Sequence, residues 1–164
     1  MLRQISRFLT AALAIAFLAS PAVAGELEEK NKALARIVFE EVLGKGRIEE
    51  NEPIYSPSFV AHGMYKESGR VEDREATKGW RQAFPDLKIT VDKIVAEGEM
   101  VAVRFIGEGT HTGSGNGLAA TGKSIRVAGM TMFRIVDGKI TEEWSSFDQM
   151  DLLRQLGLLP AGSK

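Results

Sequence analysis

The hydrophobic pattern of the chain changes its period from helical to strand-like at Pro85, and this change constrains the fold more than any other feature. Before Pro85, apolar residues recur every three or four positions over residues 27–43 and 72–84, which is typical of amphipathic helices. After Pro85, apolar and polar residues alternate, which is typical of strands with one buried face. The first half of the chain therefore predicts helices, and the second half predicts a sheet.

The strands expected after Pro85 form a meander that ends in a helix. Four strand-like segments follow one another: residues 87–95, 100–107, 124–136 and 140–147. Asp137-Gly138 is a two-residue hairpin signal between the last two. A helix over 148–156 is closed by Gly157, and residues 59–64 are expected to form a short extended piece. This order predicts an α+β domain: a curved antiparallel sheet forming a cone-shaped barrel, closed by the N-terminal helices, with a short C-terminal helix. The mouth of such a cone is a common site for a small apolar ligand.

The first 24 residues have the pattern of a secretory signal peptide. Two arginines precede an apolar run over residues 8–19, and small residues lead to a cleavage signal after Ala24. The apolar run is shorter than the roughly 20 residues that a membrane-spanning helix needs. We therefore expect a periplasmic or secreted protein whose single domain is residues 25–164, with no membrane association once the leader is removed.

Composition argues against several classes of function. The chain has no cysteine, which excludes a disulfide framework and thiol catalysis. The only histidines, His62 and His111, lie far apart and match no zinc spacing, so no metal is expected. The 21 basic residues are balanced by 22 acidic ones and form no block, which argues against nucleic acid. Gly122-Lys123-Ser124 lacks the earlier glycine of a phosphate-binding loop and leads into a strand, so no nucleotide cofactor is expected.

Asp148, at the junction of the last strand and the last helix, is the main candidate for a chemical role. If that strand is regular to its end, Asp148 shares a face with Ile140 and Trp144 and points into the interior. A carboxylate beside an indole is partly desolvated, which raises its pKa and suits it to general acid/base catalysis near neutral pH. Asp is also a favoured N-cap, so the residue is explained as well by starting the helix, and a cap can also face a pocket. The sequence leaves both interpretations open.

Further candidates surround this position. His111, in a glycine-rich loop, is either a proton-transfer group at the pocket mouth or a loop histidine bonded to backbone. His62 either orients a substrate carbonyl by hydrogen bonding or packs in the core. The remaining candidates are large apolar side chains expected in the pocket wall or the core: Trp80, Phe84, Trp144 and Met130.

Several motifs together resemble the SnoaL-like polyketide cyclase family, over residues 31–157. They are FPDL (84–87), GTHTG (109–113), TGK (121–123), DGKI (137–140), and a Trp followed four residues later by Asp148 and then by QLG. The resemblance implies the nuclear transport factor 2 type of fold and ring closure by intramolecular aldol condensation, without metal or organic cofactor. It also implies that Asp148 is the acid/base and that the sheet forms a homodimer through its outer face. Glu143 departs from the pattern, since many relatives have His at this position.

The sequence therefore predicts an exported, cofactor-independent enzyme of the cyclase type. Asp148, assisted by His111, would abstract a proton alpha to a carbonyl of a small apolar compound, and the enolate would attack a second carbonyl held nearby. Two alternatives stay open: a non-catalytic periplasmic module that binds a small hydrophobic ligand in the same cone, and a related isomerase or hydrolase on the same scaffold.

Overall fold

The computed structural model describes residues 21–63 and 66–159. Two long N-terminal segments are helical: α1 (Pro21–Ile37), which continues into a π-helical segment η1 (Val38–Leu43), and α2 (Arg70–Ala83). A short 3-10 turn, η2 (Glu52–Ile54), lies between them. A third helix, α3 (Gln149–Leu156), ends at Gly157, whose left-handed conformation (φ 68°) suits glycine. No helix of the described ranges is long and apolar enough to cross a membrane. The predicted leader lies almost wholly outside these ranges, and α1 runs through its expected cleavage point.

Within the described ranges, six strands form one sheet in the order β2-β1-β6-β5-β4-β3. Their bounds are β1 Tyr55–His62, β2 Glu67–Gly69, β3 Lys88–Glu97, β4 Met100–Thr110, β5 Ser124–Val136 and β6 Lys139–Phe147. The predicted meander is present as β3 to β6, with every neighbouring pair antiparallel. However, β1 pairs with β6 in parallel, so the sheet is mixed, and its order is open, so the barrel does not close.

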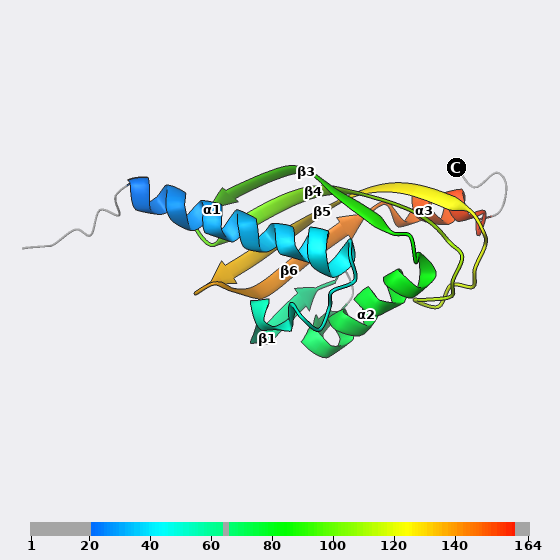
Figure 1. Cartoon of the computed structure of the whole chain (residues 1–164), viewed down its shortest axis with the longest axis horizontal. Helices are drawn as coiled ribbons and strands as arrows, with labels where there is room; N and C mark the ends of the chain where they lie inside the picture. The colour runs from blue at the N-terminus through cyan, green and yellow to red at the C-terminus, as the bar shows by residue number, and fades with distance from the viewer. Residues whose placement is uncertain (1–20, 64–65, 160–164) are drawn as a thin grey trace, which may run out of the picture.

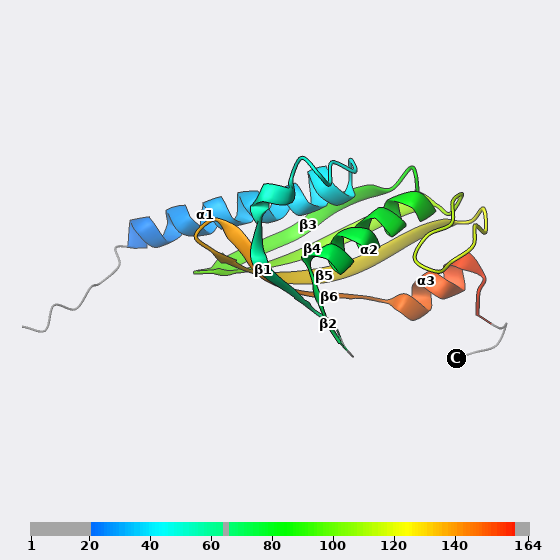
Figure 2. The ribbon, with the colours of Figure 1, turned by 90° about the horizontal axis from the view of Figure 1, so that it is seen from below.

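The helices and the strand pattern give the sheet one covered face and one exposed face. α1 packs on β3 and β4, α2 packs on β1 and β2, and α3 packs on β5. Figure 2 shows α1 and α2 lying along the sheet, and Figure 1 shows α3 beyond the end of β6. Along β5, buried and exposed side chains alternate without a break, as expected for such a strand.

Two buried apolar clusters hold the two ends of the covered face. The larger joins α1 and η1 to the sheet through residues such as Phe39, Val101 and Phe133. The smaller joins the end of α2 to α3 through Phe84 and Leu156. Together these side chains anchor the helices above the sheet, and the space between the clusters is the pocket described below.

A β-bulge early in β6 decides which of its side chains face the helices. Ile140 pairs with Ile135, but the neighbouring β5 residue on the antiparallel strand, Arg134, pairs with Glu142 and not with Thr141. Thr141 is therefore an extra residue, and its hydroxyl donates to the carbonyl oxygen of Arg134 at 3.1 Å. Because side chains alternate in a strand, one inserted residue moves every later side chain to the opposite face.

Candidate functional site

A pocket of about 310 Å³ lies between the helices and the covered face of the sheet. Its wall on one side is η1, where Val38, Phe39, Val42 and Leu43 all line the space. π-helical turns are rare and are often found at functional sites. The volume is at the lower end of the range for pockets that bind small molecules.

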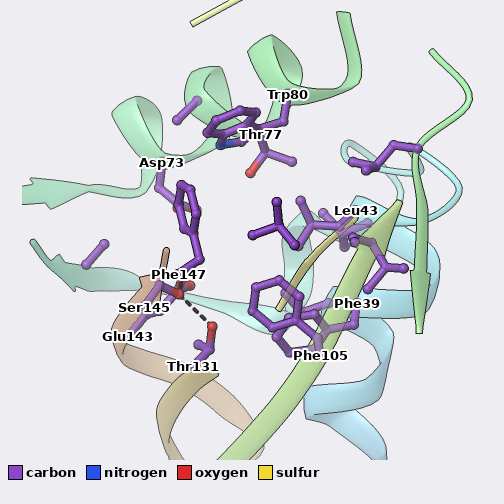
Figure 3. Close-up of a pocket in the computed structure, with 18 of the residues that line it drawn as sticks. Phe39, Leu43, Asp73, Thr77, Trp80, Phe105, Thr131, Glu143, Ser145 and Phe147 are labelled. Atoms are coloured by element: carbon purple, nitrogen blue, oxygen red, sulfur yellow. Dashed lines mark hydrogen bonds between the residues drawn. The ribbon is translucent and has the colours of Figure 1, made fainter. Parts of the chain in front are cut away.

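One face of α2 forms the roof of this pocket. Its lining residues follow helical spacing, and they change from polar to apolar along the helix: Asp73, Ala76, Thr77, Trp80 and then Phe84 just past its end. Figure 3 shows Trp80 and Thr77 on this roof, with Phe39 and Phe105 on the opposite side. Trp80 and Phe84 thus lie where the helical pattern predicted.

The polar groups of the pocket gather near β6. Because of the bulge at Thr141, the lining residues of β6 are Glu143, Ser145 and Phe147. Ser145 Oγ donates to Glu143 Oε1 at 2.6 Å, and Thr131 Oγ1 lies 2.6 Å from the same Ser145 oxygen. Figure 3 shows Thr131, Ser145 and Glu143 side by side. This chain of hydroxyls holds the Glu143 carboxyl in one orientation.

The Glu143 carboxyl is tuned for proton transfer. Burial, together with the negative charge of Asp73, raises its pKa from 4.5 to about 7, against smaller opposing effects of the Ser145 hydrogen bond and of Arg70. No basic side chain of residues 21–63 or 66–159 forms an ion pair with it. A carboxyl with a pKa near 7 is populated in both its acid and base forms at neutral pH, which suits general acid/base catalysis.

Asp73 has a different environment. Arg70 Nη1 binds Asp73 Oδ2 at 2.6 Å, and Arg70 Nη2 binds Glu52 at 2.8 Å. The same guanidinium carbon lies 3.6 Å from the centre of the Tyr55 ring. Burial raises the pKa of Asp73, while Arg70 opposes that rise. Asp73 is therefore committed to an ion pair, whereas Glu143 remains free to exchange a proton.

The expectation that Asp148 points into the pocket is wrong. Asp148 is exposed, does not line the pocket, and accepts a hydrogen bond from the backbone N–H of Asp151 at 2.8 Å, as the N-cap of α3. The physical reason is the bulge at Thr141. After it, the odd-numbered residues of β6, rather than the even-numbered ones, face the helices and the pocket. The capping interpretation accounts for this residue.

The same change of face moves Trp144 out of the predicted pocket wall. Trp144 pairs with Met132 on the exposed face, where its indole stacks on the His62 ring at 4.6 Å. Met130 also lies on that face, 55% exposed, because it belongs to the outward series of β5. Neither side chain lines the pocket.

The two histidines are also separated from the predicted chemistry. His62 lies at the pocket rim, but its ring nitrogens bind Glu67 at 3.1 Å and Glu142 at 2.8 Å. His111 is fully buried outside the lining and stacks on Phe84 at 4.9 Å, and its Nδ1 is 3.1 Å from the Thr121 hydroxyl. Its backbone joins the ends of the glycine-rich loop, so His111 acts as the structural loop histidine.

Sequence reasoning missed Glu143 and Asp73. Glu142 and Glu143 are adjacent, so one of them must face inward whichever register the strand adopts. Asp73 lies four and seven residues before Thr77 and Trp80, on the same helical face. Within the described ranges, no group of three or more His, Cys, Asp or Glu side chains could hold a metal ion.

Comparison with solved structures identifies the scaffold. AclR from Streptomyces galilaeus, for which a hydroxylase activity has been proposed, is 29% identical with a TM-score of 0.75, over 84% of this chain and 87% of that one. IdmH from Streptomyces antibioticus, proposed to be a polyketide cyclase, is 26% identical with a TM-score of 0.67, over 77% of this chain and 98% of that one. A SnoaL-like protein from Jannaschia sp. CCS1, 22% identical with a TM-score of 0.73 over 86% and 97%, supports the fold alone.

The sequence itself gives the family. No curated protein matches it. The model of the SnoaL-like polyketide cyclase family matches residues 33–156, which include both apolar clusters, α2 and every strand. The six-stranded sheet, the helices on its covered face and the pocket between them agree with that assignment. The chain therefore belongs to the SnoaL-like polyketide cyclase family.

Proposed function

We propose that this protein is a cyclase-type enzyme in which Glu143, rather than Asp148, is the general acid/base. The observation that carries the proposal is an ion-pair-free carboxyl, with a pKa of about 7, in the wall of a largely apolar pocket. The family assignment supports ring-closing chemistry in general. The apolar walls favour a small carbonyl compound with a large hydrocarbon part.

Glu143 can serve both halves of an aldol-type ring closure. Its carboxylate takes the proton from a carbon alpha to a carbonyl, so the C–H bond breaks and its electrons form an enolate. The enolate carbon attacks a second carbonyl of the same molecule, which forms the C–C bond and leaves an alkoxide. The carboxylic acid returns its proton to the alkoxide, which gives a neutral alcohol and regenerates the Glu143 carboxylate.

Tyr55 is suited to stabilise the oxygen that becomes negative. Its side chain is buried in the pocket lining, and burial together with the negative charge of Glu143 raises its pKa. The phenol therefore stays protonated at any working pH and can donate a hydrogen bond to an enolate or alkoxide oxygen. The walls formed by Trp80 and Phe84 would hold the two reacting carbons close together.

The test is proton abstraction from a model ketone that requires no knowledge of the natural substrate. 2-Tetralone in D2O exchanges its alpha protons, and mass spectrometry or NMR follows the rate. The wild type should accelerate exchange, and Glu143→Gln should lose about 10²–10⁴-fold of that acceleration. The matched control is Asp148→Asn, which keeps an N-cap oxygen and should retain activity. If Asp148→Asn loses exchange while Glu143→Gln retains it, the assignment fails. If 2-tetralone binds and no variant exchanges it, the non-catalytic binding alternative gains.

Two expectations from the sequence accompany this proposal. Export through cleavage after Ala24 rests on the composition of the leader. Homodimer formation through the exposed face of the sheet is supported by the large apolar side chains there: Val95, Met130 and Met132 are 65%, 55% and 44% exposed. An exposed apolar patch rimmed by charged residues is typical of an interaction surface.

A further inference from the structure

The pocket carries acidic groups without free basic ones, and this asymmetry restricts the charge of its ligand. Asp73 and Glu143 both line the space. Among the described residues, the one basic residue of the lining is His62, at the rim, and both of its ring nitrogens bind carboxylates, those of Glu67 and Glu142. No lining cation is left to neutralise a negatively charged ligand.

Arg70, a cation next to the pocket, has both of its terminal nitrogens in ion pairs. Its two terminal nitrogens bind Asp73 at 2.6 Å and Glu52 at 2.8 Å, and its guanidinium packs over the Tyr55 ring. Its Nε has no accessible surface, so a ligand in the pocket cannot reach it. Arg74 also pairs with Glu52, at 3.9 Å, so the two arginines balance the charges of Asp73 and Glu52. Ionised Glu143 is then left as a negative charge of the pocket that no ion pair compensates.

Aromatic rings complete a surface that favours positive charge. Trp80 lies 5.8 Å from Phe147 in an edge-to-face arrangement and 6.2 Å from Phe84. Phe147 lies beside Glu143 and Ser145 in the polar part of the pocket, as Figure 3 shows. Aromatic faces attract ammonium groups, and an adjacent carboxylate adds direct ion pairing.

We propose that the pocket selects ligands by charge: it prefers a hydrophobic molecule whose polar end is a protonated amine, accepts a neutral one less tightly, and excludes a free carboxylate. The inference rests on the proposed function, since it concerns the same pocket and names the charge of its substrate. A carbonyl substrate of this enzyme therefore buries no carboxylate beside Glu143. Burying an anion beside another unpaired anion is strongly unfavourable, because neither charge is compensated by a partner.

The test compares three probes that differ mainly in their polar end: 4-phenylbutylamine, 4-phenylbutan-1-ol and 4-phenylbutanoate. Isothermal titration calorimetry at pH 8 should give a dissociation constant about tenfold lower for the amine than for the alcohol. The dissociation constant of the carboxylate should be at least about tenfold higher than that of the alcohol. At pH 6 the gap between amine and alcohol should narrow, because Glu143 is then mostly protonated. The charged or titratable groups that face Glu143 are Arg70 and Asp73 on α2 and Tyr55 on β1.

Two variants separate this inference from a general effect of charge. Glu143→Gln should remove most of the preference for the amine and leave the alcohol unchanged. Asp137→Asn removes one carboxylate at the β5–β6 turn, outside the pocket, where Asn tolerates the positive φ of 49°, and should keep the wild-type ranking.

The inference is overturned if the carboxylate binds as tightly as the alcohol, if the amine does not bind, or if Glu143→Gln keeps the full preference. Equal binding of the three probes, together with loss of ketone exchange in Glu143→Gln, would leave the proposed function standing. The expected ranking, together with exchange retained in Glu143→Gln, would support the charge selection and refute the catalytic role.

Discussion

Replacing Glu143 by Gln should make the protein more stable at alkaline pH. Gln has the shape of the protonated carboxyl, and its Oε1 can still accept the hydrogen bond from Ser145. The substitution therefore removes the possibility of a buried negative charge while the surrounding contacts remain. The protein then avoids the cost of ionising this group inside the pocket.

The size and sign of the effect follow from the pKa of Glu143. The group ionises at about 4.5 in the unfolded chain and at about 7 in the folded protein. Between these values the folded state holds more protons than the unfolded state, so the free energy of unfolding decreases as pH rises. One pKa unit corresponds to about 1.36 kcal/mol, so the full loss is about 3 kcal/mol, complete above pH 7 and absent below pH 4.5. Glu143→Gln has no such loss.

Urea unfolding followed by tryptophan fluorescence measures this difference. At pH 5 the wild type and Glu143→Gln should differ by less than about 1 kcal/mol, and at pH 8 the variant should be more stable by about 3 kcal/mol. Asp137→Asn, which removes an exposed carboxylate, should follow the wild type at both pH values. A variant that is equally destabilised at pH 5 and pH 8 would refute the reasoning, because the charge of Glu143 would then carry no cost.

Three further outcomes test the account. Asp148→Asn should change the free energy of unfolding by less than about 0.5 kcal/mol, and Asp148→Ala should lower it by about 1 kcal/mol. If the two variants lower it by the same amount, the carboxylate does more than cap α3. Gly115→Ala should cost about 1–3 kcal/mol, because its Cβ would lie 2.0 Å from the carbonyl oxygen of Gly79 in α2; an unchanged melting temperature would show that the loop does not pack there. Met130→Glu should turn the proposed dimer into a folded monomer in sedimentation, and an unchanged mass would exclude this face as the interface.

The order of helices and strands could be predicted because it depends on local patterns. The helical period over 27–43 matches α1 and η1, and the Asp137-Gly138 turn joins β5 to β6 as expected. The parallel pairing of β1 with β6 could not be predicted in the same way. It joins segments about 80 residues apart with no turn between them, so no local signal marks it.

The candidate site depended on a register that the sequence does not show. Residues 140–147 contain apolar side chains of both parities, since Ile140 and Trp144 are even and Phe147 is odd. Alternation alone therefore cannot reveal the bulge at Thr141 or decide which of two adjacent glutamates faces inward. The pocket-facing side of α2 was easier to predict from the sequence, because Trp80 and Phe84 follow one helical period without interruption.

Both the proposed catalysis and the proposed charge selection require that the Glu143 carboxyl lies in the pocket and titrates near neutral pH. Carbon-13 NMR of protein labelled at the glutamate side chains measures this directly, with the Glu143 signal assigned by its absence in Glu143→Gln. The carboxyl chemical shift of Glu143 should titrate with a midpoint of about 7. A midpoint at the ordinary glutamate value of 4.5 would contradict it.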